Sequence, residues 1–228
     1  MPLELTELPA GRAFGGGVTS APPLTSSLPL PLAVLTMELQ RGVMGDLATF
    51  PELAAAASNR GIVANAARLL TAFRAAGLPV VHCTAEFRAD RAGTVTNTPL
   101  HTTVLRKPAH LLEDTPATEL VPGLGVEVTD VVATHRHGVA PFTGTPLHGT
   151  LSEWGVRVLV VAGVSVNLGV LGLCLEAVNL GYQVVVATGA VCGVPLDYGD
   201  DVLARSISLV AAVHPVDQIA GALARLTR

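Results

Sequence analysis

The sequence predicts an α/β protein with three layers (α/β/α) around a mostly parallel central sheet, as in Rossmann-like folds. Short apolar runs rich in β-branched residues recur along the chain, and segments with helical periodicity separate most of them. The stretch 158–177 shows the pattern most clearly. Its apolar run is closed by Gly163, and a proline-free run over 168–180 then stops at Gly181, as a helix commonly does. Strands that alternate with helices favour right-handed crossovers and a parallel sheet covered on both faces.

The elements expected from this pattern can be placed along the chain. Strands are expected at 32–37, 79–84, 128–134, 157–162 and 182–187, and helices at 61–76, 147–154, 167–180, 200–212 and 216–226. Residues 85–126 are polar, contain proline and lack periodicity, which predicts a long excursion with one short helix beside a binding site. Residues 188–199 are expected to form a loop at the rim of the pocket.

Length and composition indicate one domain behind an irregular leader. Residues 1–30 are rich in proline and glycine, which excludes a regular element, and no function is assigned to them. Residues 31–228 are expected to form a single domain, because half of the 228 residues are hydrophobic and can build one sizeable core.

Charge and cysteine usage exclude several classes of partner. The net charge is −4, and Lys107 is the single lysine among 14 basic residues, which argues against nucleic acid and anionic membranes as partners. No apolar run reaches membrane-spanning length, and acidic residues near the start are wrong for a secretory signal. Three cysteines without metal-type spacing favour reduced thiols in the cytoplasm. The histidines are scattered, so neither a metal nor another cofactor is predicted.

The turn after the run at 158–162 resembles a motif of isochorismatase-like (cysteine hydrolase) proteins, Gly-Val-x-Thr-x-x-Cys-Val. Gly163, Val164 and Val170 match it, whereas Gly169 stands where the nucleophilic cysteine would be, as it does in true isochorismatases. The likeness extends over roughly residues 32–215 and implies the isochorismatase-type fold.

In that family the peptide that corresponds to Val164–Ser165 is cis, and two backbone N–H groups form an oxyanion hole. Carried over, the donors would be Ser165 and Gly169, with Asn167 between them in contact with the substrate. N–H groups in the first turn of a helix are unpaired and favour negative charge in any case. The alternative is that Ser165 or Asn167 only caps the helix, while Gly169 permits close packing.

Two further motifs carry the resemblance. Glu38 and Gln40 correspond to an Asp-x-Gln motif whose acid is the general acid/base, although Glu38 could equally be a solvated loop acid or the partner of a structural arginine. Phe142 opens a Phe-x-Gly-Thr-x-Leu run that the family places six residues after a lysine. Counting back gives Arg136, which cannot transfer protons and would clamp an anionic group or hold Glu38 ionised.

The flanking histidines and one tyrosine complete the predicted site. His137 is slightly favoured over His135 to point inward, and Tyr198 is expected at the pocket rim. Two hypotheses result. The first is a hydrolase of a small anionic metabolite that works without a cysteine nucleophile. The second is a catalytically inactive relative that binds a small molecule or serves as an oligomeric scaffold. By resemblance, the chain is expected to form homodimers or tetramers.

Overall fold

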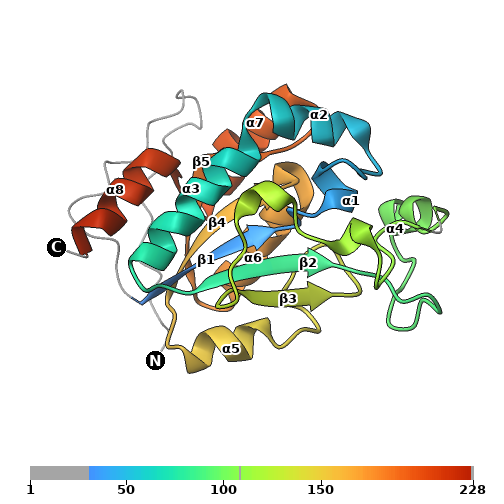
Figure 1. Ribbon diagram of the computed structural model, residues 1–228, viewed down its shortest axis with the longest axis horizontal. Coiled ribbons are helices and arrows are strands. Elements are labelled where there is room, and N and C mark those ends of the chain that lie inside the picture. The colour runs from blue at the N-terminus through green and yellow to red at the C-terminus, as the bar shows by residue number, and fades with distance from the viewer. Residues whose placement is uncertain (1–30, 108, 227–228) are drawn as a thin grey trace, which may run out of the picture.

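A computed structural model describes residues 31–107 and 109–226, so the predicted leader at 1–30 lies outside the described residues. Six parallel strands form one sheet in the order β3-β2-β1-β4-β5-β6 (Figure 1). The strands are β1 Leu32–Met37, β2 Val80–Ala85, β3 Val131–His135, β4 Val158–Val164, β5 Gln183–Cys192 and β6 Ala212–Pro215. The order reverses at β1, which is where open α/β sheets form a crevice for ligands.

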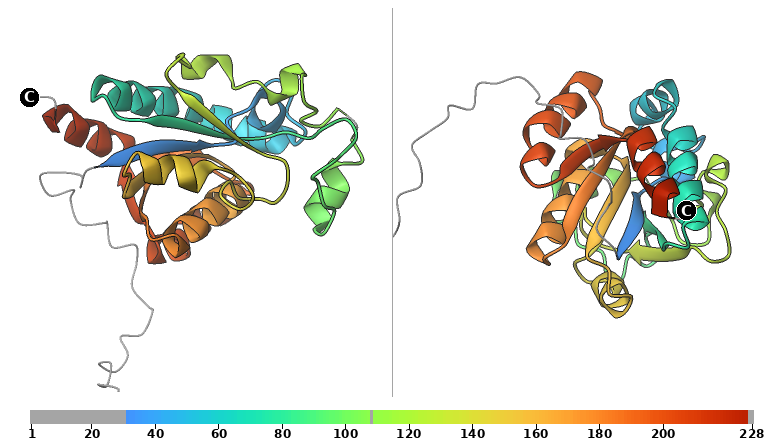
Figure 2. Two further views of the ribbon diagram at one scale, coloured as in Figure 1. Left: turned by 90° about the horizontal axis from the view of Figure 1, so that it is seen from below. Right: turned by 90° about the vertical axis from the view of Figure 1, so that its left-hand side faces the viewer.

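Helices cover both faces of the sheet and complete the three layers (Figure 2). One face packs against α2 Pro51–Asn59, α3 Ile62–Ala75 and α8 Val216–Leu226. The other packs against α5 Leu147–Glu153, α6 Leu171–Asn179 and α7 Leu196–Arg205. The remaining short helices are α1 Arg41–Met44 and α4 Pro99–Val104. The predicted fold class is therefore confirmed.

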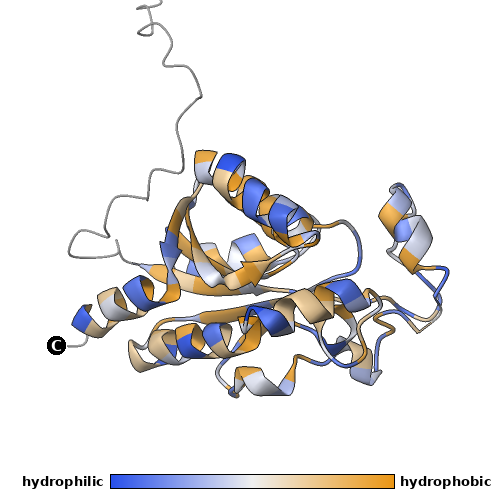
Figure 3. Cartoon of the chain, turned by 90° about the horizontal axis from the view of Figure 1, so that it is seen from above, coloured by the Kyte–Doolittle hydropathy of each residue, from blue (hydrophilic) through white to orange (hydrophobic). Residues whose placement is uncertain are grey.

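The central strand β1 shows how the two cores are divided. All six of its residues are buried, and side chains of a strand alternate between the faces. Leu32 and Val34 pack into the core under α3 and α8, while Leu35 and Met37 pack into the core under α5 and α6. Figure 3 shows hydrophobic colouring along the strands and mixed colouring on the helices, as expected for helices that bury only one face.

The prediction was wrong between 188 and 212. Strand β5 continues through Gly189 to Cys192, since a register shift against β4 accommodates Gly189 at φ 84°. Helix α7 begins at Leu196 rather than near 200, because Gly199 packs closely against Gly193 instead of breaking the helix. The chain then forms β6 between the two helices expected at 200–212 and 216–226, where no strand was predicted. That strand buries only one of its four residues, which leaves no periodic signal in the sequence.

Helices α1 and α2 and one π-helical turn were not predicted. The turn, Val166–Val170, precedes α6, so the helix expected at 167–180 is regular only over Leu171–Asn179. The excursion after β2 has the one short α-helix that was expected, α4. Figure 1 shows α4 apart from the layers, at the end of the molecule toward which the arrows of β1, β2 and β3 point. No helix in the described part of the chain is long and apolar enough to cross a membrane.

Candidate active site

A cavity of about 200 Å³ lies at the carboxyl ends of β1, β2 and β3. Its wall comes from the ends of the strands, the helix α4 excursion, the loop after β3 and the turn before α6. The polar side chains in the lining are Glu38, His101, His110, His135, Ser165 and Asn167. The other lining residues are Gly42, Val43, Phe50, Leu53, Ala85, Phe87, Leu100, Val104, Leu111, Gly138, Val139, Leu168, Gly169 and Val194.

Glu38 follows β1 directly and turns out of the sheet. Its N–H donates to the carbonyl of Cys83 (2.9 Å), and its φ of 50° lies in the left-handed region, which is unusual for a residue other than glycine. The neighbouring strand β4 approaches β1 very closely at this point. A Cβ on Gly163 would lie 2.2 Å from the carbonyl oxygen of Met37, so only glycine fits there. The Glu38 side chain reaches the cavity and remains 20% exposed.

His135, the last residue of β3, lies against Glu38. Its Nε2 is 3.4 Å from Glu38 Oε1, within ion-pair range but longer than a good hydrogen bond, and its side chain is only 3% exposed. Its Nδ1 is buried and has no hydrogen-bond partner among the described residues. Buried polar atoms are nearly always paired, so this nitrogen is available to a water molecule or a ligand.

Arg136 lies outside the cavity, contrary to the prediction. Its side chain is 45% exposed and pairs with Glu86 (2.8 Å) and Glu113 (3.7 Å). Counting along the chain to Arg136 missed the alternation of side chains at the strand end, which turns neighbouring residues to opposite sides. The structure therefore corrects the partner of Glu38: the imidazole of His135, rather than the guanidinium of Arg136, lies against its carboxylate.

The turn before α6 brings Ser165, Asn167 and Gly169 to the cavity together. The Val164–Ser165 peptide is cis, and the Ser165 carbonyl accepts hydrogen bonds from the N–H groups of Leu168 and Val170 (3.1 and 3.0 Å). The Ser165 hydroxyl donates to the Asn167 side-chain carbonyl. Asn167 and Gly169 are thus held beside Glu38 and His135 by local bonds, and π-type turns of this kind occur frequently at functional sites.

Gly169 packs closely enough to restrict what could replace it. A Cβ at this position would lie 3.1 Å from Cε of Met37, so a larger residue requires Met37 to move. None of the three cysteines lines the cavity, and all three are buried and unpaired. Burial raises the pKa of Cys174 to about 12 and that of Cys192 to about 11, and it raises the pKa of Cys83 further. Their thiols are accordingly protonated at neutral pH and do not supply a nucleophile.

Four other predicted site residues lie outside this cavity. The fully buried amide of Gln40 bonds the backbone of Ala85, through both its N–H and its carbonyl, and so ties the end of β1 to β2. Phe142 is buried in the core, with its ring centroid 5.9 Å from that of Tyr182. Tyr198 is exposed on α7. His137 is not a lining residue either, although its ring centroid is 6.0 Å from that of the lining residue His101.

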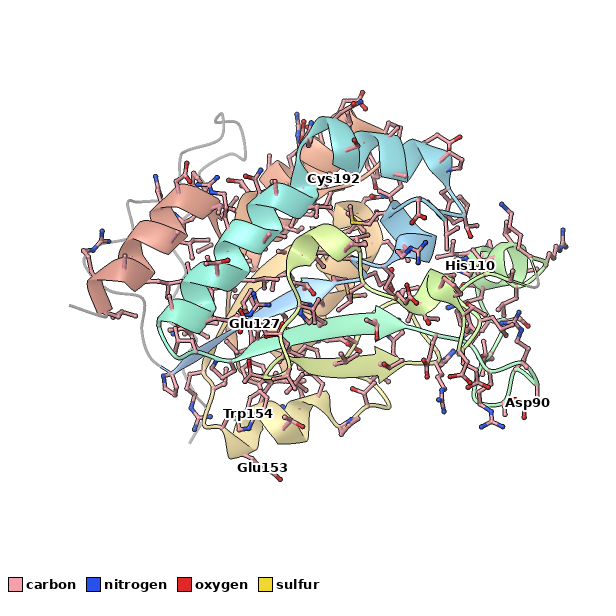
Figure 4. All side chains as sticks on the ribbon, viewed as in Figure 1. Asp90, His110, Glu127, Glu153, Trp154 and Cys192 are labelled. Carbon is pink, nitrogen blue, oxygen red and sulfur yellow. The ribbon has the colours of Figure 1, made fainter. Side chains whose placement is uncertain are left out.

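Sequence reasoning missed the histidines and aromatic residues that the excursion contributes. His101 on α4 and His110 after it line the cavity, and Phe87 packs between them, 6.5 and 5.8 Å from their ring centroids. Figure 4 shows His110 beyond the ends of the strands, beside α4. These residues have no periodic pattern, so the only signal in the sequence was the length of the excursion itself. Within the described residues, no group of three or more His, Cys, Asp or Glu side chains is placed to hold a metal ion.

Comparison with known proteins agrees with this architecture. The isochorismatase domain family matches residues 33–218. The chain belongs to the isochorismatase family. The uncharacterised isochorismatase family protein YecD of Escherichia coli O157:H7 is 28% identical over 195 residues, which cover 84% of this chain and 95% of YecD.

Solved structures of this family share the fold. An isochorismatase family protein from Burkholderia thailandensis superposes with a TM-score of 0.71 at 29% identity, covering 90% of this chain and all of that one. N-carbamoylsarcosine amidase from Thermoplasma acidophilum superposes with a TM-score of 0.64 at 22% identity, covering 82% of this chain and 98% of that one. The second likeness shows the shared fold alone.

Proposed function

We propose that this isochorismatase-family protein hydrolyses a small molecule without a cysteine nucleophile and uses Glu38 as its general acid/base. One observation supports the proposal above the others: the Glu38 carboxylate, the buried imidazole of His135 and the turn at 165–169 line the same cavity. That cavity lies at the edge of the sheet where open α/β folds bind their ligands.

Each group has a distinct part in the proposed reaction. Glu38 takes a proton from the attacking water or gives one to the leaving group. His135 exchanges that proton with Glu38, because an imidazole can both give and take a proton near neutral pH, whereas the guanidinium of Arg136 cannot. Backbone N–H groups of Ser165 and Gly169 stabilise the negative charge that develops on the substrate. No covalent enzyme intermediate is formed, since Gly169 has no side chain to attack with.

The decisive experiment replaces Glu38 by glutamine and measures turnover on a panel of esters, amides and vinyl ethers. Glu38→Gln keeps the shape of the side chain and removes proton transfer, so kcat/KM should fall by about 10²–10⁴-fold on any substrate the wild type hydrolyses. Glu153→Gln, an exposed acid on α5, is the matched control and should leave turnover unchanged. Equal turnover by Glu38→Gln and wild type would remove Glu38 from the mechanism.

The alternative is a catalytically inactive relative that binds a small molecule or acts as an oligomeric scaffold. It is favoured by Gly169 at the position of the family's nucleophile and by Arg136, which pairs with Glu86 away from the cavity. This reading predicts no turnover by the wild type on the same panel, while a ligand of the cavity still raises the melting temperature.

Assembly and location also remain proposals. Helix α6 and the residues beside it carry exposed apolar side chains, at Leu168, Leu175, Val178 and Leu180, which suit self-association into a dimer or tetramer. Sedimentation or light scattering would measure the mass in solution, and a monomer at micromolar concentration would contradict this. The unpaired state of all three cysteines supports a cytoplasmic location.

A further inference from the structure

Most of the cavity wall is apolar. Around the polar groups beside Glu38, the lining consists largely of aromatic and aliphatic side chains, which include Phe50, Leu53, Phe87 and Val104. Such a wall stabilises apolar atoms of a ligand and offers nothing to replace the water that a charged group would lose on entry.

The two histidines in this part of the wall add no positive charge. The Nδ1 atoms of His101 and His110 bond the hydroxyls of Thr98 (2.9 Å) and Thr49 (2.6 Å). Burial lowers the pKa of His101, and burial with the nearby cations Arg91 and Lys107 lowers that of His110 to about 4. Both imidazoles are consequently neutral at pH 7.

The charges near the cavity disfavour an anionic ligand. Among the described residues that line it, Glu38 is the one carboxylate and there is no lysine or arginine. Arg91 and Lys107 lie over the rings of Phe87 (5.7 Å) and Phe50 (5.8 Å), but neither is a lining residue. An anion would therefore sit beside the carboxylate of Glu38 in a largely apolar space, without a lysine or arginine in direct contact.

The volume limits the ligand to about one ring. An engineered apolar cavity of about 150 Å³ in another protein holds one benzene molecule. The cavity here, at about 200 Å³, has room for a ring or a short branched chain with one polar substituent.

We propose that the substrate is a small uncharged molecule of about one ring in size, with one hydrolysable group beside Glu38 and His135 and an apolar remainder against the wall of Phe50, Leu53 and Val104. The inference rests on the proposed hydrolase function and replaces the anionic substrate expected from Arg136. Hydrolysis of such a molecule breaks one C–N or C–O bond: the water oxygen bonds to the carbon, and the water proton passes through Glu38 to the leaving group.

Three probes of nearly equal shape separate the charge classes: benzamide is neutral, benzoate is an anion and benzamidinium is a cation. Binding to the full-length protein at pH 7.5 would be measured by ligand-observed NMR. Benzamide should bind at least tenfold more tightly than benzoate, and Glu38→Gln should narrow this ratio by removing the like charge. Benzamidinium should bind no more tightly than benzamide, because its charge loses hydration on entering a largely apolar cavity, which offsets its attraction to Glu38.

Two tryptophan variants locate the binding. Val104→Trp fills the cavity and should abolish benzamide binding, whereas Val128→Trp, at a fully exposed position, should leave it unchanged. If Val104→Trp does not fold, Leu100→Trp on the same helix serves instead. The inference is overturned if benzoate or benzamidinium binds more tightly than benzamide, or if none of the probes binds. The turnover of Glu38→Gln remains an independent test of the hydrolase proposal, so the two can fail separately.

Discussion

Two carboxylate–histidine pairs connect the strands β1, β2 and β3, and they differ in how completely their atoms are bonded. In the first pair, His82 Nε2 lies 3.2 Å from Asp130 Oδ2, and His82 Nδ1 bonds the hydroxyl of Thr36 at 2.8 Å. In the second pair, His135 Nε2 lies 3.4 Å from Glu38 Oε1, and His135 Nδ1 has no partner among the described residues. Both histidines are buried, so burial alone does not separate the two pairs.

We call His82 and Asp130 the sealed pair, because both side chains are buried and their polar atoms are hydrogen-bonded within the protein. Arg74 on α3 donates to Asp130 (Nε to Oδ1, 3.0 Å), and the N–H of Glu127 donates to the same carboxylate (2.9 Å). Burial raises the pKa of Asp130, but these bonds together outweigh it and lower the pKa. In Figure 4, Glu127 lies near the start of β3, away from His110, which lines the cavity. A satisfied network holds structure together, whereas an unsatisfied pair that faces a cavity can bind and react.

The largest effect that separates the pairs should come from Asp130→Asn. It removes the closer of the two carboxylates that pair with the mostly buried guanidinium of Arg74 and leaves only the exposed Glu127 at 3.8 Å, so it should lower the free energy of unfolding by about 3–5 kcal/mol, measured by urea denaturation. Asp46→Asn, which breaks an exposed pair with Arg41, should cost less than about 1 kcal/mol. Similar costs for the two variants would mean that the sealed pair contributes no more than a surface pair.

His135→Asn tests the second pair with the opposite expectation. Because Nδ1 is already unpartnered, removing the imidazole should change the free energy of unfolding by less than about 1 kcal/mol, while kcat/KM falls by about 10²-fold. Glu153→Gln, at an exposed position on α5, is the control and should preserve both. A stability loss as large as that of Asp130→Asn, with unchanged turnover, would assign His135 a structural role.

The sequence revealed the strand ends more reliably than the partners that meet there. Strand β1 was predicted at its observed bounds because six consecutive apolar or weakly polar residues are buried. Glu38 and the turn at 165–169 were predicted to lie at this edge because each directly follows such a strand and matches a motif of the family, and both line the cavity. His135 was passed over for Arg136, since spacing along the chain does not show which of two neighbouring side chains turns toward Glu38.

The part of the cavity wall that comes from the excursion after β2 could not be predicted from the sequence, for a different reason. Phe87, His101 and His110 come from a segment without periodicity, and tertiary contacts alone bring them to the ends of the strands. The same applies to the sealed pair, because Asp130 precedes β3 in a polar stretch and its partner Arg74 lies on the exposed flank of a helical pattern. Long-range polar pairs of this kind leave no mark in local sequence.

As the pH falls, the buried histidines should lower the free energy of unfolding at a higher pH than the carboxylates do. Burial lowers the pKa of His82 and, with nearby cations, that of His110 to about 4, whereas an unfolded histidine titrates near about 6.5. The unfolded chain therefore binds more protons below about pH 6.5, so the free energy of unfolding should be constant above that pH and fall toward pH 4. The free energy of unfolding falls between pH 6.5 and 4.5, and His110→Gln should make this loss smaller by about 1–2 kcal/mol, measured by urea denaturation at each pH. An unchanged slope would show that His110 is not neutral in the folded protein.

A small effect on stability should come from placing a thiol in the cavity beside Glu38 and His135. In Gly169→Cys the new Cβ would lie 3.1 Å from the flexible end of Met37, so we expect a loss of about 1 kcal/mol in the free energy of unfolding. The new thiol lines the cavity and should react with iodoacetamide at pH 8 at least tenfold faster than any cysteine of the wild type. The native thiols are buried, and burial raises the pKa of Cys192, the lowest of the three, to about 11. Ser152→Cys on exposed α5 gives the rate of a freely accessible thiol. If the wild type were labelled as fast as Ser152→Cys, the buried native thiols would be readily accessible to the reagent. The contrast between the buried interior and the accessible cavity would then be contradicted.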